Sequence, residues 1–511
     1  MKVLLINPLS QSNQWENDII AKQHSCGILY IASFLRRFGH DVRFFERKFA
    51  VGFKARTADS LFLADKQLYK YIENFHPDYI GITAATAQIM DVYRCAKLVK
   101  EYSKKIKIII GGPHSSAEPE RSLKQCMDID AACIGEGEQT MLEFVEGYPL
   151  QKIRGIVFRD NGEIKINEAQ PVIKHLDTIP FPAYDLLNFD FYFSPSSTTI
   201  VKGISLKGTS ILTQRGCPYS CSFCQNPMLR EANAGRFHRC HSPDYVAAHI
   251  SHLLDRYKVK TFLFDDPVFL IDKKRTLEIC NMLIKNKFNK KLSYGVHLRT
   301  DNVDEEVLKA LKQSGCIRIV YGLEANSFNT LRRMNKNITP QDNLRAIRLT
   351  KKQGICCVAN IIVGTPGETE HDFIETIKSL VKVRPDWIRS HKFYPLPGTL
   401  FYKQLLKEGK VESDGNWEGL YDKMVLGDVT FADMSYLNFE RLRSILDKKA
   451  VLPVNYLFKI KENIKTNPIY ALHQFFLMIG HILFLYLSRS IRKKLLKIAR
   501  IKPKYEYLVQ Q

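Results

Sequence analysis

The chain has 511 residues, of which 45% are hydrophobic and 25% charged. At roughly 100–200 residues per domain, this length predicts two to four domains with buried cores. A mean hydropathy of −0.20 excludes a polytopic membrane protein. The 75 lysines and arginines exceed the 53 aspartates and glutamates, and the net charge of +22 indicates an anionic membrane surface or nucleic acid as a partner. The basic residues are densest at the C-terminus and form no RNA-binding repeat, which favours the membrane surface over nucleic acid.

The N-terminus, MKVLLINPLS, is too short an apolar run for an export signal and instead predicts a first strand. We therefore expect the protein in the cytoplasm. Its twelve cysteines then lie in a reducing compartment. Clustered cysteines in such a compartment bind metal more often than they form disulfides.

Residues 1–150 alternate short apolar runs with amphipathic helical segments. Runs that are apolar throughout are typical of a parallel sheet covered on both faces. We therefore predict an α/β, doubly wound, Rossmann-like domain whose ligand lies beyond the carboxyl ends of its strands. The predicted strands are Lys2–Ile6, Asp41–Phe45, Tyr79–Thr83, Ile106–Ile110 and Ala131–Ile134. The predicted helices are Gly27–Phe38, Leu68–Phe75, Ala87–Ser103, Glu120–Cys126 and Thr140–Glu146.

Three further regions follow in the chain. Residues 151–196 carry two short strands, Ile156–Arg159 and Glu163–Asn167, and are interpreted as a connector packed on the next domain. Residues 197–410 repeat strand and helix, which predicts a partial (β/α)6 barrel with its function at the C-terminal rim of the strands. Residues 411–511 are helical in pattern and basic. The six barrel strands are predicted at Ser210–Gln214, Lys260–Phe264, Leu292–Leu298, Ile317–Leu323, Cys357–Ile362 and Trp387–Tyr394.

A cysteine triplet follows the first barrel strand directly, in the stretch CPYSCSFC from Cys217 to Cys224. Three thiolates at this CxxxCxxC spacing can ligate three irons of a [4Fe–4S] cluster and leave the fourth iron open to a ligand. Zinc stays an alternative, because His238 and Cys240 could complete a four-ligand site.

The triplet, with aromatic Phe223 before its last cysteine, resembles the signature of the radical S-adenosylmethionine (SAM) superfamily, and the resemblance extends over roughly residues 1–400. It implies that Cys217, Cys221 and Cys224 are the catalytic, cluster-binding residues and that the open iron binds SAM. For the other matching residues a structural interpretation stays open, in which they are carboxylates and turns that cap the barrel rim. The resemblance assigns contacts with SAM to Phe223, Asp265, Asp266, Arg299, Glu324, Gly364, Pro366 and Pro397.

The first domain, placed before such a barrel, resembles the cobalamin-binding domain of the radical SAM enzymes that use both cofactors. The Asp-x-His-x-x-Gly motif that supplies a histidine to cobalt in other cobalamin proteins is absent, so no protein histidine is expected on the metal. A sheet that serves only as a docking module is the alternative. The resemblance assigns cobalamin contacts to Thr83, Thr86, Gly111, Gly112, His114, Gly135, Glu136 and Gly137.

The resemblance implies a cobalamin-dependent radical SAM enzyme that transfers a methyl group to an unactivated carbon of a small molecule. A flavodoxin- or ferredoxin-type protein is the expected electron donor. Three alternatives stay open: oxidative cyclisation of a tetrapyrrole, methylthiolation of tRNA, and a non-catalytic cobalamin or redox sensor. The N-terminal cysteines Cys26, Cys95, Cys126 and Cys133 do not form the pattern of a tRNA methylthiotransferase.

The C-terminal tail contains nineteen uncharged residues, Ile469–Leu487, followed by eight basic residues within Arg489–Lys504. Nineteen largely apolar residues approach the ~20 that span a bilayer. Three interpretations stay open: a buried helical hairpin, helices lying at the inner membrane surface, and a true span. Membrane contact would favour a lipid or porphyrin substrate.

Overall fold

The computed structural model describes residues 1–10, 25–51, 58–188, 192, 200–201, 204–205, 208–412, 416–417, 419 and 429–451. It also describes residues 454, 455, 457, 468, 472, 475, 476 and 479. Two compact units divide the chain. The first comprises residues 1–192, 214–241 and 395–421, and the second comprises residues 193–213, 242–394 and 422–511.

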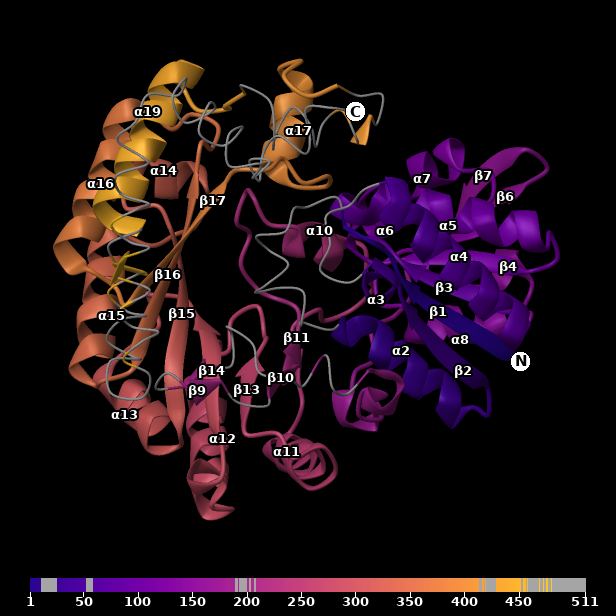
Figure 1. Cartoon of the computed structure of the whole chain (residues 1–511), viewed down its shortest axis with the longest axis horizontal. Helices are drawn as coiled ribbons and strands as arrows, with labels where there is room; N and C mark the ends of the chain where they lie inside the picture. The colour runs from indigo at the N-terminus through magenta and orange to yellow at the C-terminus, as the bar shows by residue number, and fades with distance from the viewer. Residues whose placement is uncertain are drawn as a thin grey trace. The chain divides into compact units, whose positions relative to one another are not determined.

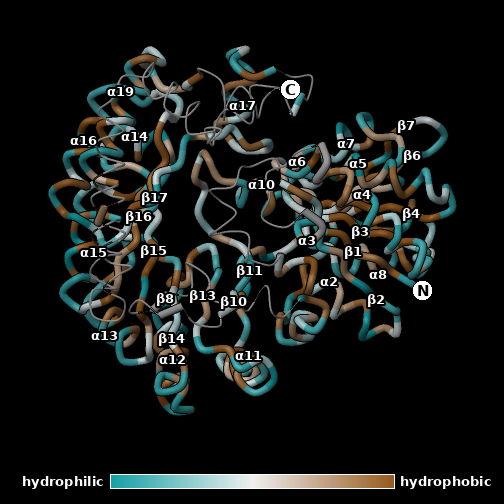
Figure 2. The backbone as a smooth tube through the Cα atoms, in the orientation of Figure 1, coloured by the Kyte–Doolittle hydropathy of each residue, from teal (hydrophilic) through white to brown (hydrophobic). Residues whose placement is uncertain are grey.

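The first unit contains a seven-stranded sheet with the order β2-β1-β3-β4-β5-β6-β7. Every residue of β1 after Lys2 is buried, as expected for a strand covered on both faces, and Figure 2 shows this apolar centre in brown. The pairings from β2 to β5 are parallel, which confirms the predicted doubly wound fold. The strands are β1 (Lys2–Asn7), β2 (Asp41–Glu46), β3 (Tyr79–Thr83), β4 (Lys107–Gly111) and β5 (Ala131–Cys133). The helices are α2 (Cys26–Arg37), α3 (Arg47–Val51), α4 (Ala58–Phe75), α5 (Ile89–Tyr102), α6 (Pro113–Ala117), α7 (Pro119–Gln125) and α8 (Glu138–Val145).

The predicted connector belongs to this sheet. Its two strands, β6 (Ile156–Asp160) and β7 (Glu163–Ile166), extend the sheet beyond β5 in antiparallel pairings. The expectation that they pack on the following domain was therefore wrong. The hairpin turn at Asn161-Gly162, with positive φ at both residues, directs β7 back along β6.

The second unit contains a six-stranded parallel sheet with the order β10-β13-β14-β15-β16-β17, as predicted for a partial barrel. In Figure 1 helices α13, α14, α15, α16 and α19 run along one side of β15–β17. The strands are β10 (Gly208–Ile211), β13 (Thr261–Phe264), β14 (Ser293–Leu298), β15 (Cys316–Glu324), β16 (Cys356–Val363) and β17 (Trp387–Lys392). The helices are α11 (Pro243–Tyr257), α12 (Lys273–Lys285), α13 (Glu305–Gln313), α14 (Phe328–Arg333), α15 (Pro340–Lys352), α16 (Glu370–Val383) and α19 (Tyr436–Leu446).

Two later segments of the chain complete the first unit. One is a short antiparallel ribbon of β11 (Gln214–Arg215) and β12 (Arg239–Cys240), with α10 (Asn226–Glu231) between them. The other carries α17 (Leu400–Lys407) and Trp417. The predicted tail, Ile469–Leu487, lies largely outside the described residues. Within the described part of the chain no helix has the length and apolarity to cross a bilayer.

Candidate functional site

The cysteine loop begins where the β11–β12 ribbon ends. Gly216 has φ +81°, and a Cβ atom there would lie 2.6 Å from the carbonyl oxygen of Phe237, so only glycine fits directly before Cys217. Cys217 and Cys221 are buried, and Cys224 is half-buried. Phe223, between the last two cysteines, is also half-buried.

Asn226 helps to define the environment of the third cysteine. Its backbone N–H and its side-chain amide donate to Cys224 Sγ at 3.5 and 3.4 Å. The loop itself closes through a bond from Cys224 N–H to the carbonyl of Cys221 at 3.1 Å. Hydrogen bonds to sulfur stabilise a thiolate and tune the potential of an iron–sulfur cluster. The loop thus offers three thiols suited to cluster ligation, and Asn226 is a residue that sequence reasoning missed.

The zinc alternative is not supported by the geometry. His238 Nε2 lies 3.3 Å from Gln214 Oε1 and 3.7 Å from Cys240 Sγ, so these two candidates gather around Gln214. A single zinc ion needs its ligand atoms within a span of a few ångströms. Among the described residues, no group of three ligand atoms within 4.8 Å of one another includes a cysteine of the triplet.

Two arginines, the half-buried Arg215 and the buried Arg239, attach the cysteine loop to the doubly wound sheet. Arg215 Nη2 donates to Glu138 Oε1 at 2.6 Å, and Arg215 Nη1 lies 3.5 Å from Glu136 Oε2. Arg239 forms a two-pronged pair with Glu136. The backbone N–H of Glu136 donates to Asn233 Oδ1 at 3.0 Å. We call Arg215, Arg239, Glu136 and Glu138 the arginine–glutamate clamp. The structure thus places the carboxylate of Glu136, a predicted cobalamin contact, in ion pairs.

The remaining predicted cobalamin contacts line the C-terminal edge of the first sheet. Thr83 and Gly111 are paired at the ends of β3 and β4, and Gly112 follows. Gly135 and Gly137, half-buried, flank Glu136 after β5. A Cβ atom at Gly111 would meet Cys133 at 3.7 Å, an ordinary contact, so the backbone there is open to a flat ligand such as a corrin ring. At Gly135 the protein itself fills this space, because a Cβ atom would meet Asn233 and the carbonyl of Ala232.

His114 is held inside the protein at this edge. Its side chain is fully buried, and its Nδ1 atom lies 3.1 Å from Thr86 Oγ1. Burial, and then the charge of Arg121, lower its pKa to about 3, so the ring is neutral. The Trp417 ring packs edge-on against it at 4.8 Å between centroids. Trp417 in turn donates from Nε1 to Gln125 Oε1 at 3.0 Å. Trp417 carries no motif and is found only in the structure.

Asn7 and Glu46 form a second polar group, at the ends of β1 and β2. Asn7 Nδ2 donates to Glu46 Oε2 at 2.8 Å, and the Tyr192 hydroxyl donates to the same oxygen. Burial raises the pKa of Glu46, and its Oε1 atom is buried without a hydrogen-bond partner among the described residues. No sequence motif pointed to this carboxyl group.

The N-terminal cysteines resemble core residues. Cys26, Cys95, Cys126 and Cys133 are all buried. Burial raises the pKa of the thiols of Cys95, Cys126 and Cys133, which opposes formation of the thiolate that a cluster needs. A second cluster of the tRNA methylthiotransferase kind is therefore not supported.

The second unit holds the predicted SAM-binding acids. Asp266 is fully buried, and its two carboxylate oxygens accept from the backbone N–H and the hydroxyl of Thr213, both at 2.7 Å. It ties β10 to the end of β13. Asp265 is half-buried, with Oδ1 3.9 Å from Nδ1 of His297. This difference favours Asp265 as the ligand-binding acid and Asp266 as its structural neighbour.

Arg299 and Glu324 are joined through Lys336. The Arg299 guanidinium donates to both oxygens of Asp301, and at 2.7 Å to the backbone carbonyl of Lys336. Lys336 Nζ donates to Glu324 Oε1 at 3.0 Å. A Cβ atom at Gly322 would meet that oxygen, so a larger residue there would require the Glu324 carboxylate to shift.

The turns that carry the predicted SAM contacts Gly364, Pro366 and Pro397 form hydrogen bonds within the protein. The N–H groups of Gly364 and Thr365 donate to Glu368 Oε2 at 2.6 and 3.3 Å, and Pro366 is buried between them and Glu368. In the first unit, the carbonyl of buried Pro397 accepts from Gln225 Nε2 at 2.9 Å. Pro397 therefore supports the segment that follows the cysteine loop.

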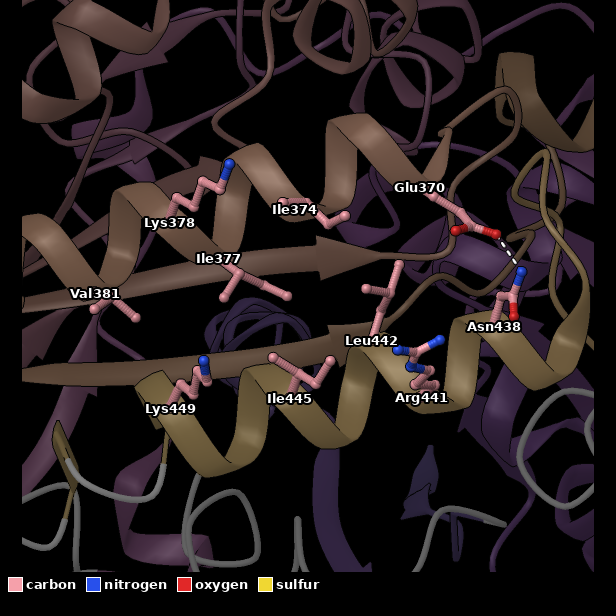
Figure 3. A pocket seen from close by; sticks show the side chains of 10 residues that line it. All are labelled: Glu370, Ile374, Ile377, Lys378, Val381, Asn438, Arg441, Leu442, Ile445 and Lys449. Carbon is pink, nitrogen blue, oxygen red and sulfur yellow. Dashed lines mark hydrogen bonds between the residues drawn. The ribbon is translucent and has the colours of Figure 1, made fainter.

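A groove of about 490 Å³ lies apart from these residues, between α16 and α19 (Figure 3). Its floor is apolar, from Ile377 and Leu442, and Lys378 and Lys449 stand at its rim. The nearby trio His371, Asp372 and Glu375 brings three ligand atoms within 4.8 Å of one another. Asp372, however, accepts from the N–H and hydroxyl of Thr369, the N-cap of α16, and so completes a capping box, which gives the trio a structural explanation.

Two family descriptions match the chain. That of the radical SAM superfamily matches residues 211–380, and that of the B12 binding domain matches residues 19–145. An uncharacterized methyltransferase of Pyrococcus horikoshii is 32% identical, over 79% of this chain and 83% of its own length. An anaerobic magnesium-protoporphyrin IX monomethyl ester cyclase of Rubrivivax gelatinosus is 29% identical, over 79% of this chain and 70% of its own.

A solved structure shares the fold. The radical SAM methyltransferase TsrM of Kitasatospora setae, with cobalamin and a [4Fe–4S] cluster bound, superposes with a TM-score of 0.68. The match covers 94% of this chain and 98% of that chain at 15% identity.

Proposed function

Because the chain belongs to the radical SAM enzymes that carry a B12-binding domain, we propose that it transfers a methyl group to a carbon atom of a small molecule. One observation carries the proposal: the arginine–glutamate clamp fastens the cysteine loop to the edge of the first sheet where cobalamin is expected. When bound at Cys217, Cys221 and Cys224, a [4Fe–4S] cluster would provide the reductive cleavage of SAM, and cobalamin at the edge of the first sheet would provide the methyl-transfer chemistry. Residues 1–150 then form the cobalamin-binding part, and residues 197–410 form the barrel.

The residues of the chain have three roles in this proposal. Cys217, Cys221 and Cys224 bind iron, and Asn226 stabilises the third thiolate through its two N–H···S bonds. Asp265 and Glu324 hold SAM at the rim of the second sheet. Four buried residues support that rim from inside the protein: Asp266, Arg299, Gly364 and Pro366.

The test compares cysteine variants after anaerobic reconstitution. Replacing Cys217, Cys221 and Cys224 with alanine should remove cluster iron and abolish SAM cleavage to 5′-deoxyadenosine. Cys240→Ala is the control, because this thiol contacts Gln214 and His238 and should keep both properties. Iron retained by the triple variant, or lost from the control, would contradict the proposal.

Oxidative cyclisation of a tetrapyrrole is the second candidate, since the Rubrivivax relative is named as such a cyclase. Incubating the reconstituted enzyme with SAM and magnesium-protoporphyrin IX monomethyl ester separates the two reactions. A new ring without methyl incorporation from labelled SAM would select the cyclase. Product that carries the label would select the methyltransferase.

We propose two partners in addition to the substrate. A flavodoxin- or ferredoxin-type protein of the cytoplasm delivers the electron that the cluster passes on. The C-terminal region binds the inner membrane surface. The described residues Leu472, Phe475, Phe476 and Ile479 support this second partner, because they are helical, exposed and spaced so as to share one helix face. The basic residues of Arg489–Lys504 add charge complementary to anionic lipid.

A further inference from the structure

The two faces of the second sheet differ in chemistry. The register places Ile319, Cys357 and Tyr321, Ala359, Ile388 side by side on one face, and all are buried. Figure 1 shows helices along this side of β15–β17. The opposite face includes the buried residues Val320 and Val358, but it also carries half-exposed polar residues on β14, β15, β16 and the edge strand β17. This inner face carries His297, Arg318, Cys356, Asn360 and Arg389.

Arg389 is the unusual member of the inner face. It lies beside Asn360 on β16, and its buried Nε atom has no hydrogen-bond partner among the described residues. Among the residues that the structure describes, no carboxylate forms an ion pair with its guanidinium. Of its charged or titratable neighbours, the thiol of Cys356 raises the pKa of Arg389, whereas Arg318 adds a second positive charge.

The electrostatics around Arg389 are consistent with its geometry. Burial, and then the charge of Arg318, lower the pKa of Arg389. An arginine stays protonated even where its pKa is lowered, so the unpaired charge lowers the stability of the folded protein. Burial also lowers the pKa of His297. The charge of Asp265 raises this pKa and the charge of Arg389 lowers it, and the net lowering leaves His297 neutral.

A partly buried cation without a counter-charge costs free energy, and a ligand that supplies the missing charge would recover it. A guanidinium with an open donor set matches the geometry of carboxylate and phosphate groups. We propose that Arg389 binds an anionic group, carboxylate or phosphate, of the substrate on the inner face of the barrel. This inference rests on the proposed function and deepens it, because it assigns the enzyme an acidic small-molecule substrate.

The direction in which the positive charge extends favours the substrate as the source of the anion. Arg389 pairs with Asn360, and Glu324 pairs with the next residue, Ile361, so Arg389 lies one position, about 3 Å, below that acid. Arg318 lies six residues before Glu324 on β15, about 20 Å below the rim. The predicted SAM-binding acids Asp265 and Glu324 stand at strand ends, whereas the positive charge extends below them.

The experiment measures anion-dependent stability of the reconstituted holoenzyme. Thermal unfolding is followed with inorganic phosphate or benzoate against chloride at equal ionic strength. We expect Arg389→Leu to unfold at a higher temperature than wild type in chloride and to lose the added stabilisation by phosphate or benzoate. Arg389→Lys keeps the charge but loses the paired N–H donors of the guanidinium. In this variant the anion concentration that gives half of the stabilisation should rise at least tenfold. Arg348→Leu, on the exposed side of α15, is the control for general salt effects.

A second measurement identifies the source of the anion. SAM affinity is determined by equilibrium dialysis, and SAM cleavage by formation of 5′-deoxyadenosine. Substrate recognition predicts that Arg389→Leu keeps SAM affinity within about twofold and still cleaves SAM. A tenfold loss of SAM affinity would assign the anion to the SAM carboxylate and overturn the proposal. An anion response of Arg389→Leu and Arg389→Lys equal to that of Arg348→Leu would also overturn it. Neither result touches the proposed function, which fails only if the wild type neither binds the cluster nor cleaves SAM.

Discussion

Glu324 illustrates how a single residue at this site depends on its neighbours. It adopts φ +64°, a left-handed conformation that is costly for a glutamate, at a bulge in the pairing of β15 with β16. Lys336 and the absence of a side chain at Gly322 stabilise it there. The spacing Gly-Leu-Glu is therefore readable from the sequence as a motif, whereas its reason is visible only in three dimensions.

Glu368 predicts a measurable pH dependence. Burial raises its pKa from 4.5 to about 8 while its carboxyl group accepts from the N–H groups of Gly364 and Thr365. The folded protein thus binds a proton that the unfolded chain has lost between pH 4.5 and 8. Folding stability should therefore fall as pH rises through this window, by up to about 5 kcal/mol at about 1.4 kcal/mol per unit.

The measurement is urea unfolding of Glu368→Gln between pH 4.5 and 8. Glutamine resembles the protonated acid, so we expect the variant to match wild type near pH 4.5 and to exceed it near pH 8. Glu375→Gln, at a half-exposed position on α16, should leave the wild-type profile unchanged. A wild-type slope in Glu368→Gln would show that another group titrates.

His114 gives a spectroscopic prediction. Its Nδ1 atom faces Thr86 and its ring is covered by Trp417, so we expect no cobalt coordination by this ring. The spin-resonance spectrum of the Co(II) form should lack nitrogen splitting from a protein histidine. His114→Phe should leave that spectrum unchanged. Splitting in the wild type that disappears in His114→Phe would refute the prediction.

Among the elements, the β11–β12 ribbon has the largest effect on the site. Its two strands have two residues each, yet they place Arg215 and Arg239 against the loop that follows β5. The ribbon thereby couples the metal-binding loop to the cofactor edge of the first sheet. Breaking one buried pair of this kind leaves an uncompensated charge, which is more costly than losing both partners.

The clamp predicts a non-additive pair of substitutions. Glu138→Leu should destabilise the protein by about 3 kcal/mol, because Arg215 loses its close partner at 2.6 Å. Adding Arg215→Met to Glu138→Leu should restore most of that loss, as apolar groups replace both charges. Urea unfolding measures both, and corrin affinity provides the functional readout. Glu168→Gln, in an exposed pair with Arg154, is the control and should have little effect. Equal losses in the double and single variants would contradict a coupled pair.

The strands were predictable where apolar runs alternated with amphipathic helices, because each run had to be buried in a parallel sheet. The predicted strand Tyr79–Thr83 is β3 without change. The ribbon was too short to leave a periodic signal, so its role was not foreseen. The sequence pattern of β6 and β7 would be the same whichever domain they joined. Their assignment to the first sheet therefore required the observed pairing of β6 with β5.

Across the whole molecule, the compact units are not contiguous in the chain. Residues 214–241 and 395–421 join the first unit, and Trp417 contacts Gln125 across 292 positions of sequence. Local periodicity contains no information about contacts of this range. The cysteine triplet was predictable because its ligands lie within eight residues, whereas Arg389 and Trp417 acquire their environments only through packing.

The charge distribution of the whole chain leads to the last prediction, that residues beyond Ala450 carry the protein to anionic membranes. The exposed apolar residues Leu472, Phe475, Phe476 and Ile479 would enter the headgroup boundary. Each basic residue near an anionic surface contributes about 1 kcal/mol, so half of the eight within Arg489–Lys504 would suffice for stable binding. We expect the full chain to float with anionic liposomes and not with neutral ones, and high salt to release it. A variant truncated after Ala450 should stay at the bottom of the gradient. Binding that resists both salt and carbonate would instead identify a spanning segment. Equal, negligible flotation of both proteins in every lipid would refute membrane association, and with it the expectation of a lipid or porphyrin substrate drawn from the membrane.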